Sequence, residues 1–233
     1  MREDPLGPAG PHACELRRLG FEVAVATDPQ ALRRALDPPG TPAAVLLRAD
    51  LPPTELARSL ELTGRGRHGA PTVVAIGRRP PSAQLDLLRE AGVSLAAFGE
   101  VDDATLRFQV NRAFLARRTR GPARRELRVP AGWEASLQMG SRRLRGRVYS
   151  LSLQGAFLEL MRPPAHGSVA ELEMGLPGGA GRIPIEIVHT NAPGHLRRPR
   201  APIGVGVRFA ALPPALRQTI DATLARRSAA LLV

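Results

Sequence analysis

The sequence lacks several features that would assign it to familiar classes of protein. It contains one cysteine, Cys14, which excludes a disulfide framework or a cysteine-based metal site. No stretch approaches the roughly 18 consecutive apolar residues of a membrane-spanning helix. The first residues are polar and lack the apolar core of a signal peptide, so we expect a cytoplasmic protein. Aromatic residues are only 3% of the chain, and the core must therefore consist mainly of Leu, Val, Ala and Ile.

Lysine is absent, and all 33 basic residues are arginine. Codon bias in a GC-rich genome explains this composition, so the number of arginines is not evidence for an anionic ligand. Their distribution is more informative. Residues 1–116 contain 14 arginines and 14 acidic residues, whereas residues 117–233 contain 19 arginines and 7 acidic residues. The second half is therefore predicted to meet an anion, with biased codons on a solvated surface as the alternative.

The first half alternates short apolar runs with helical patterns. Such runs are typical of strands buried on both faces of a parallel sheet, and we expect strands over 22–26, 43–47, 72–76 and 94–98. Helices are predicted to begin near four polar residues, Asp28, Thr54, Ser82 and Asp102. The third of these helices should stop at Gly92. This order predicts a three-layer α/β domain without a convincing first strand.

The segments that contain these expected strands and helices resemble response-regulator receiver domains over residues 13–117. A receiver accepts phosphate on an aspartate at the end of its third strand, beside acidic residues that hold Mg²⁺. Arg48 occupies the phosphoacceptor position here, and Asp50 follows two residues later. The resemblance therefore implies a degenerate pseudo-receiver, without a phosphoacceptor, that contacts a protein partner.

The second half is rich in short strands. Trp133, Ala135, Leu137 and Met139 alternate with polar residues, and Gly140-Ser141 is a plausible hairpin turn. Further strands are expected over 144–151, 156–160, 169–174, 183–188 and 203–209. A helix should begin at Pro213-Pro214. Six short strands followed by one helix predict a small antiparallel β-barrel with a C-terminal helix.

Two motifs flank the first hairpin of this barrel. The sequence Arg124-Arg125-Glu126-Leu127-Arg128 places several planar guanidinium groups ahead of the barrel, where they can bind phosphates or guanine edges. The second motif, Ser150-Leu151-Ser152-Leu153-Gln154-Gly155, places two hydroxyl groups and a glycine where a strand must turn. Alternatively, the arginines belong to a solvated linker and the serines end a strand by bonding to backbone.

Together these motifs resemble the RxxxR and [D/N]xSxxG pair of the PilZ family, receptors for cyclic di-GMP (c-di-GMP). The resemblance covers residues 124–227, after a linker at 118–123, and it implies that the nucleotide contacts Arg124, Arg125, Arg128, Ser150, Ser152 and Gly155. Ser150 departs from the family pattern, which has Asp or Asn at that position. A hydroxyl offers one short contact where a carboxylate accepts two guanine N–H groups.

Three functions therefore remain open. The first is a c-di-GMP-binding signalling effector. The second is an adaptor in which both domains are degenerate and bind proteins without nucleotide. Nucleic-acid binding by the basic half is the third, and the sparse aromatic residues argue against it. The sequence shows no catalytic set, no histidines at metal-ligand spacing and no cofactor motif, so we expect neither an enzyme nor a metalloprotein.

Overall fold

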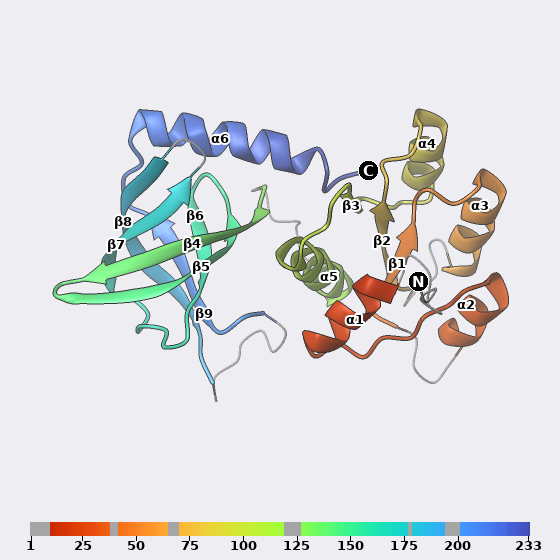
Figure 1. Ribbon diagram of the computed structural model, residues 1–233, viewed down its shortest axis with the longest axis horizontal. Coiled ribbons are helices and arrows are strands. Elements are labelled where there is room, and N and C mark those ends of the chain that lie inside the picture. Colours follow the sequence, from red (N-terminus) through yellow and green to blue (C-terminus); the bar gives the residue numbers. More distant parts are fainter. Residues whose placement is uncertain (1–9, 38–41, 65–69, 119–126, 177–178, 194–200) are drawn as a thin grey trace, which may run out of the picture. The chain divides into compact units, whose positions relative to one another are not determined.

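A computed structural model describes residues 10–37, 42–64, 70–118, 127–176, 179–193 and 201–233 (Figure 1). The chain divides into two compact units. The first comprises Met1–Pro122 together with Ala230–Val233, and the second comprises Ala123–Ala229.

A parallel sheet of three strands forms the centre of the first unit. The strands lie in the order β1-β2-β3, with Val45 beside Val73 and Val74 beside Leu95. Their bounds confirm three of the four predicted strands: β1 is Ala44–Arg48, β2 is Thr72–Gly77 and β3 is Leu95–Phe98.

The strand predicted over 22–26 is wrong, because these residues follow an irregular path. The strand order 2-1-3-4-5 that the receiver resemblance implies would pair this strand only with the first strand of the fold. No strand that the structure describes occupies that first position, so the apolar run at 22–26 has no ladder to join.

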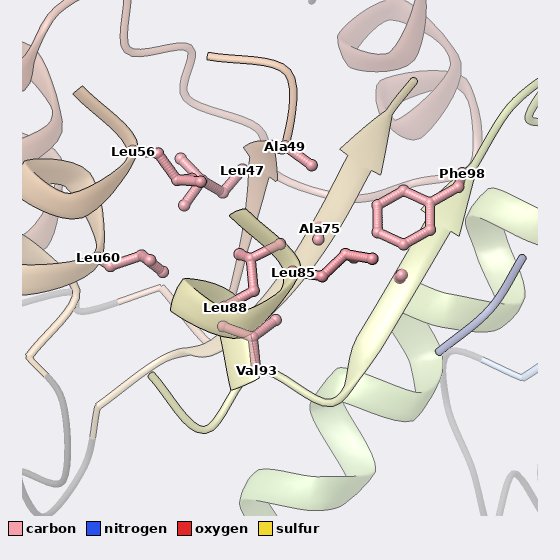
Figure 2. Close-up of a cluster of buried hydrophobic side chains, with 10 residues drawn as sticks. Leu47, Ala49, Leu56, Leu60, Ala75, Leu85, Leu88, Val93 and Phe98 are labelled. Carbon is pink, nitrogen blue, oxygen red and sulfur yellow. The ribbon is translucent and has the colours of Figure 1, made fainter. Parts of the chain in front are cut away.

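Helices cover both faces of this sheet. Leu56 and Leu60 of α3 and Leu88 of α4 pack with Leu47 and Phe98 on one face (Figure 2). On the other face, Ala113 of α5 packs with the sheet, and Leu106 and Val110 of α5 pack with Leu16 of α1. The unit is thus α/β in three layers, with helices α1 Gly10–Arg18, α2 Pro29–Leu36, α3 Pro53–Leu62, α4 Ser82–Glu90 and α5 Asp103–Arg118.

Three of the four predicted helix starts are confirmed, two of them by capping contacts. Asp28 accepts a hydrogen bond from the Ala31 N–H at 2.8 Å, and Asp102 accepts one from the Thr105 N–H at 2.7 Å. Helix α4 begins at Ser82, and the chain turns at Gly92 with φ +72°. The predicted start of α3 at Thr54 is wrong, because this helix begins at Pro53, whose fixed φ suits a first helical position.

The last residues of the chain, Ala230–Val233, belong to the first unit and are called the C-terminal tail below. The Ala96 N–H donates to the Leu231 carbonyl at 3.0 Å, and the Phe98 N–H donates to the Ala230 carbonyl at 2.9 Å. Gln109 is fully buried and its amide also donates to the Leu231 carbonyl, at 2.8 Å. The tail therefore supplies an antiparallel neighbour to β3, which the sequence patterns did not predict.

The second unit is a closed antiparallel barrel with a C-terminal helix, as predicted. The strands form a hydrogen-bonded ring in the order β4-β5-β6-β9-β8-β7 (Figure 1). Their bounds are β4 Val129–Met139, β5 Arg142–Leu151, β6 Gly155–Glu159, β7 Val169–Leu176, β8 Gly179–Asn191 and β9 Gly204–Phe209.

Helix α6, Pro214–Ser228, packs on the barrel through the buried residues Ile220 and Leu224. Arg227 in its last turn donates to the Pro130 carbonyl at 2.8 Å and lies over the Trp133 ring, 5.3 Å from the ring centre. These two contacts attach the end of α6 to the first residues of β4, next to the predicted arginine motif.

Candidate binding face on the barrel

The inner and outer faces of the barrel follow from one row of paired residues. Val129, Leu151, Ala156, Val207 and Ile187 are neighbours across five strands. Each is at most 2% exposed, so this row points into the core. Because side chains alternate along a strand, the residues on either side of this row point outward.

The predicted site lies at one end of the β4–β5 ladder. Val129 and Leu151 form the last pair of that ladder, with Arg128 directly before Val129 and Ser152 directly after Leu151. Arg128 is half-buried. The structure therefore brings one member of the arginine motif next to the serine turn. Arg124 and Arg125 lie outside the described residues.

The two serines are more enclosed than the sequence suggested. Ser150 pairs with Pro130 and Phe157 and is only 4% exposed. Ser152 is fully buried, and its hydroxyl donates to the Gly155 carbonyl at 2.9 Å, as does its backbone N–H. Ser152 thus shapes the turn, while its hydroxyl oxygen keeps its capacity to accept a hydrogen bond.

Gly155 is required by the packing of the barrel. A Cβ atom at this position would lie 2.0 Å from the carbonyl oxygen of Val207 in β9. The glycine of the second motif therefore has a structural reason that is independent of any ligand.

Several residues of β6, β8 and β9 beside the turn were not among the predicted site residues. Phe157 and His189 lie on either side of Gly206, with their ring centres 6.4 Å apart. Arg208 pairs with Gly155 and makes an ion pair with Glu186 of β8. The alternation of Val205 and Val207 with Gly206 and Arg208 in the closing strand is the sequence signal for this outer face.

A second polar group lies at the carboxyl edge of the sheet in the first unit. Arg48 ends β1, and its Nε and Nη2 atoms donate to the two carboxylate oxygens of Asp50 at 3.0 and 2.9 Å. This hydrogen bonding lowers the pKa of Asp50 and raises that of Arg48. Because the aspartate shift is downward, the pair stabilises the fold above the ordinary aspartate pKa and loses this contribution as the pH falls through the lowered value.

The carboxylate of Asp50 also lies beside Gly77, where β2 ends. A Cβ atom on Gly77 would be 3.3 Å from Asp50 Oδ1. The Asp50 carboxylate is therefore engaged by a guanidinium from its own strand end.

Within the described parts of the chain, no group of three or more His, Cys, Asp or Glu side chains could hold a metal ion. No described helix is long and apolar enough to cross a membrane.

Comparison with known families assigns the second unit. Residues 122–226 match the family model of the PilZ domain. The barrel and its C-terminal helix therefore constitute a PilZ domain, which confirms this part of the resemblance seen in the sequence. The receiver resemblance of the first unit stays a prediction.

Similar solved structures include the PilZ domain of YcgR from Escherichia coli with c-di-GMP, at 15% identity and a TM-score of 0.37 over 46% of this chain and 93% of that one. The Bacillus subtilis inhibitor of motility MotI/DgrA matches at 15% identity and a TM-score of 0.40 over 48% and 54%. E. coli YcgR in complex with c-di-GMP matches at 20% identity and a TM-score of 0.36 over 46% and 47%. The chain thus spans about half the length of MotI and YcgR. No curated protein matches its sequence.

Proposed function

We propose that the chain is a cytoplasmic signalling effector that binds c-di-GMP on its PilZ domain. Arg124, Arg125 and Arg128 would grip phosphates and guanine edges through their planar guanidinium groups. The turn that contains Ser150, Ser152 and Gly155 would form the opposing wall of the site. No catalytic role is proposed for either unit.

The observation that carries this proposal is the position of Arg128 at the end of the β4–β5 ladder. Its neighbour Val129 pairs with Leu151, so the arginine and the serine turn adjoin each other on a domain of the PilZ family. A ligand that contacts both needs no rearrangement of the barrel to reach them.

Ser150 sets the expected affinity. Loss of one charge-assisted hydrogen bond, relative to an aspartate at this position, costs about 1.5–3 kcal/mol. This corresponds to a tenfold to hundredfold weaker complex. We therefore expect measurable but weak binding, which calls for titration at high ligand concentration.

Substitution of Arg128 tests the proposed function. Arg128→Ala should weaken c-di-GMP binding in isothermal titration calorimetry by at least tenfold, because a guanidinium contact to an anion is lost. The matched control is Arg142→Ala, which removes an exposed arginine from the opposite end of β5 and should leave affinity unchanged. No heat from the unaltered protein at millimolar ligand, or equal binding by Arg128→Ala, would contradict the proposal.

A protein-binding adaptor without nucleotide is the second candidate. It is favoured because a functional residue of the family motif is replaced in each unit. Ser150 stands where the PilZ motif has Asp or Asn, and Arg48 stands where a receiver has its phosphoacceptor. The ion pair between Arg48 and Asp50 fits a first unit that serves as a contact surface.

The adaptor and effector proposals share one expectation for the first unit. Incubation with acetyl phosphate and Mg²⁺ should add no phosphate, because Asp50 is held by Arg48 and no carboxylate occupies the end of β1. Intact-protein mass spectrometry provides the measurement, and Asp50→Asn provides the control. A phosphate adduct that disappears in Asp50→Asn would show that the edge of the sheet is an active receiver site.

A further inference from the structure

The proposed nucleotide site has Ser150 at the position where the PilZ motif has Asp or Asn. Guanine carries adjacent N–H donors on its Watson–Crick edge, and an ionised carboxylate can accept both at once. Ser150 cannot replace that group, because its hydroxyl is short and the residue is almost fully buried. If guanine is bound with selectivity, another acceptor on the outer face has to supply this contact.

The outer face of the barrel provides such an acceptor on the same row as the turn glycine. Gly155 of β6 pairs with Arg208 of β9, and Arg208 pairs with Glu186 of β8. Arg208 and Glu186 point outward, because each adjoins a member of the buried row that contains Val207 and Ile187. At about 4.8 Å per strand, Glu186 lies roughly 10 Å from Gly155, within the span of a dinucleotide.

We propose that Glu186 and Arg208 form the guanine-recognition part of this site, an inference that rests on the proposed function. Glu186 would accept hydrogen bonds from the N1–H and N2–H groups of one guanine. Arg208 would hold the carboxylate in place and present its planar guanidinium to the base, by stacking or through the O6 and N7 atoms.

Accessibility supports this assignment. The side chains of Arg208 and Glu186 are 62% and 38% exposed, so a ligand can reach both. Arg208 engages one carboxylate oxygen, Oε2. An exposed ion pair of this kind contributes at most about 1 kcal/mol to folding, so its rearrangement around a base is inexpensive.

Two aromatic rings lie beside the strand that carries Arg208. Phe157 and His189 flank Gly206, two residues before Arg208 in β9, with their ring centres 6.4 Å apart. They crowd this glycine, since a Cβ atom there would lie 3.1 Å from the Cβ atom of His189. A base held by Arg208 would therefore have aromatic neighbours, which favour stacking.

Titration of three proteins with two nucleotides tests the inference. Glu186→Gln keeps the size of the side chain but replaces one acceptor oxygen by an NH₂ group. We expect about tenfold weaker binding of c-di-GMP, the loss of one charge-assisted hydrogen bond. The affinity ratio of c-di-GMP to cyclic di-AMP should fall by about the same factor, because adenine does not present two adjacent donors on that edge.

Glu173→Gln is the matched control. Glu173 of β7 makes a comparable cross-strand ion pair with Arg143 at 3.1 Å, with side chains 35% and 54% exposed. Its loss should change neither the c-di-GMP affinity nor the ratio. The unfolding midpoint followed by Trp133 fluorescence checks that each variant is folded, since the single tryptophan lies in β4.

The outcomes separate the two proposals. If the unaltered protein binds c-di-GMP and Glu186→Gln binds with the same affinity and the same ratio, the guanine-recognition role is wrong and the proposed function stands. If Glu186→Gln and Glu173→Gln weaken binding equally, the effect is electrostatic and the role is likewise wrong. If the unaltered protein binds no c-di-GMP, both proposals fall.

Discussion

Gly155→Ala is expected to destabilise the barrel by about 3 kcal/mol, the upper part of the range for overpacked positions. The new methyl group would lie 2.0 Å from the Val207 carbonyl oxygen. Side-chain rotation cannot relieve a clash between a Cβ atom and a backbone atom. Strands β6 and β9 must therefore separate, at the cost of ladder hydrogen bonds in a closed ring.

Equilibrium unfolding in urea, followed by Trp133 fluorescence, measures this effect in the full chain. Gly175→Ala is the control, because Gly175 lies in β7 and a Cβ atom there would meet nothing within 4 Å. The control should unfold at nearly the same urea concentration as the unaltered protein. Equal stability of Gly155→Ala would show that the turn glycine is free of packing constraint, and the residue would then be explained by ligand binding alone.

Deletion of residues 230–233 is expected to destabilise the first unit by about 3–5 kcal/mol. Leu231 is 4% exposed, and burial of a leucine side chain contributes about 1.5–3 kcal/mol. The deletion also removes one acceptor from the amide of Gln109, and an unsatisfied buried donor costs about 1–3 kcal/mol.

Hydrogen exchange at the amides of Ala96 and Phe98 reports this loss directly, because both donate to the tail. Exchange at these positions should become faster by more than a hundredfold, whereas amides within the barrel ladder should be unaffected. Leu232→Ala is the control, since the Leu232 side chain is 37% exposed and its truncation leaves the backbone of the tail in place. Unchanged protection after the deletion would mean that the tail adds nothing to β3.

The barrel was predictable from the sequence because its determinants are local. Alternating apolar residues such as Leu137 and Met139 mark the strands, and Gly140 permits the tight turn between β4 and β5 with φ +58°. The order of the six strands was not predicted, because β4 pairs with β7 and β6 with β9, which are distant in the sequence. Arg128 and the serine turn could also be placed together, because both lie beside the same ladder.

Long-range pairing explains what the sequence did not show. The run at 22–26 has the composition of a strand, but strand formation needs a neighbour. Conversely, residues 229–233 form a short apolar run that was not predicted to join a sheet. The Leu231 carbonyl accepts hydrogen bonds from the Ala96 N–H of β3 and from the buried amide of Gln109, and both donors come from distant parts of the sequence. The outward position of Glu186 likewise depends on register with β9, which a single strand pattern cannot fix.

Closure of the barrel limits how another protein can attach to the second unit. All six strands pair with a neighbour on each side, so the barrel presents no complete edge strand to a partner. A partner therefore meets mainly the side chains of the outer wall. In the first unit, by contrast, β1 pairs on one side only with β2, and no strand that the structure describes occupies its other side. The sheet of the first unit is thus open and that of the second closed, and the barrel offers a partner mainly shape and charge.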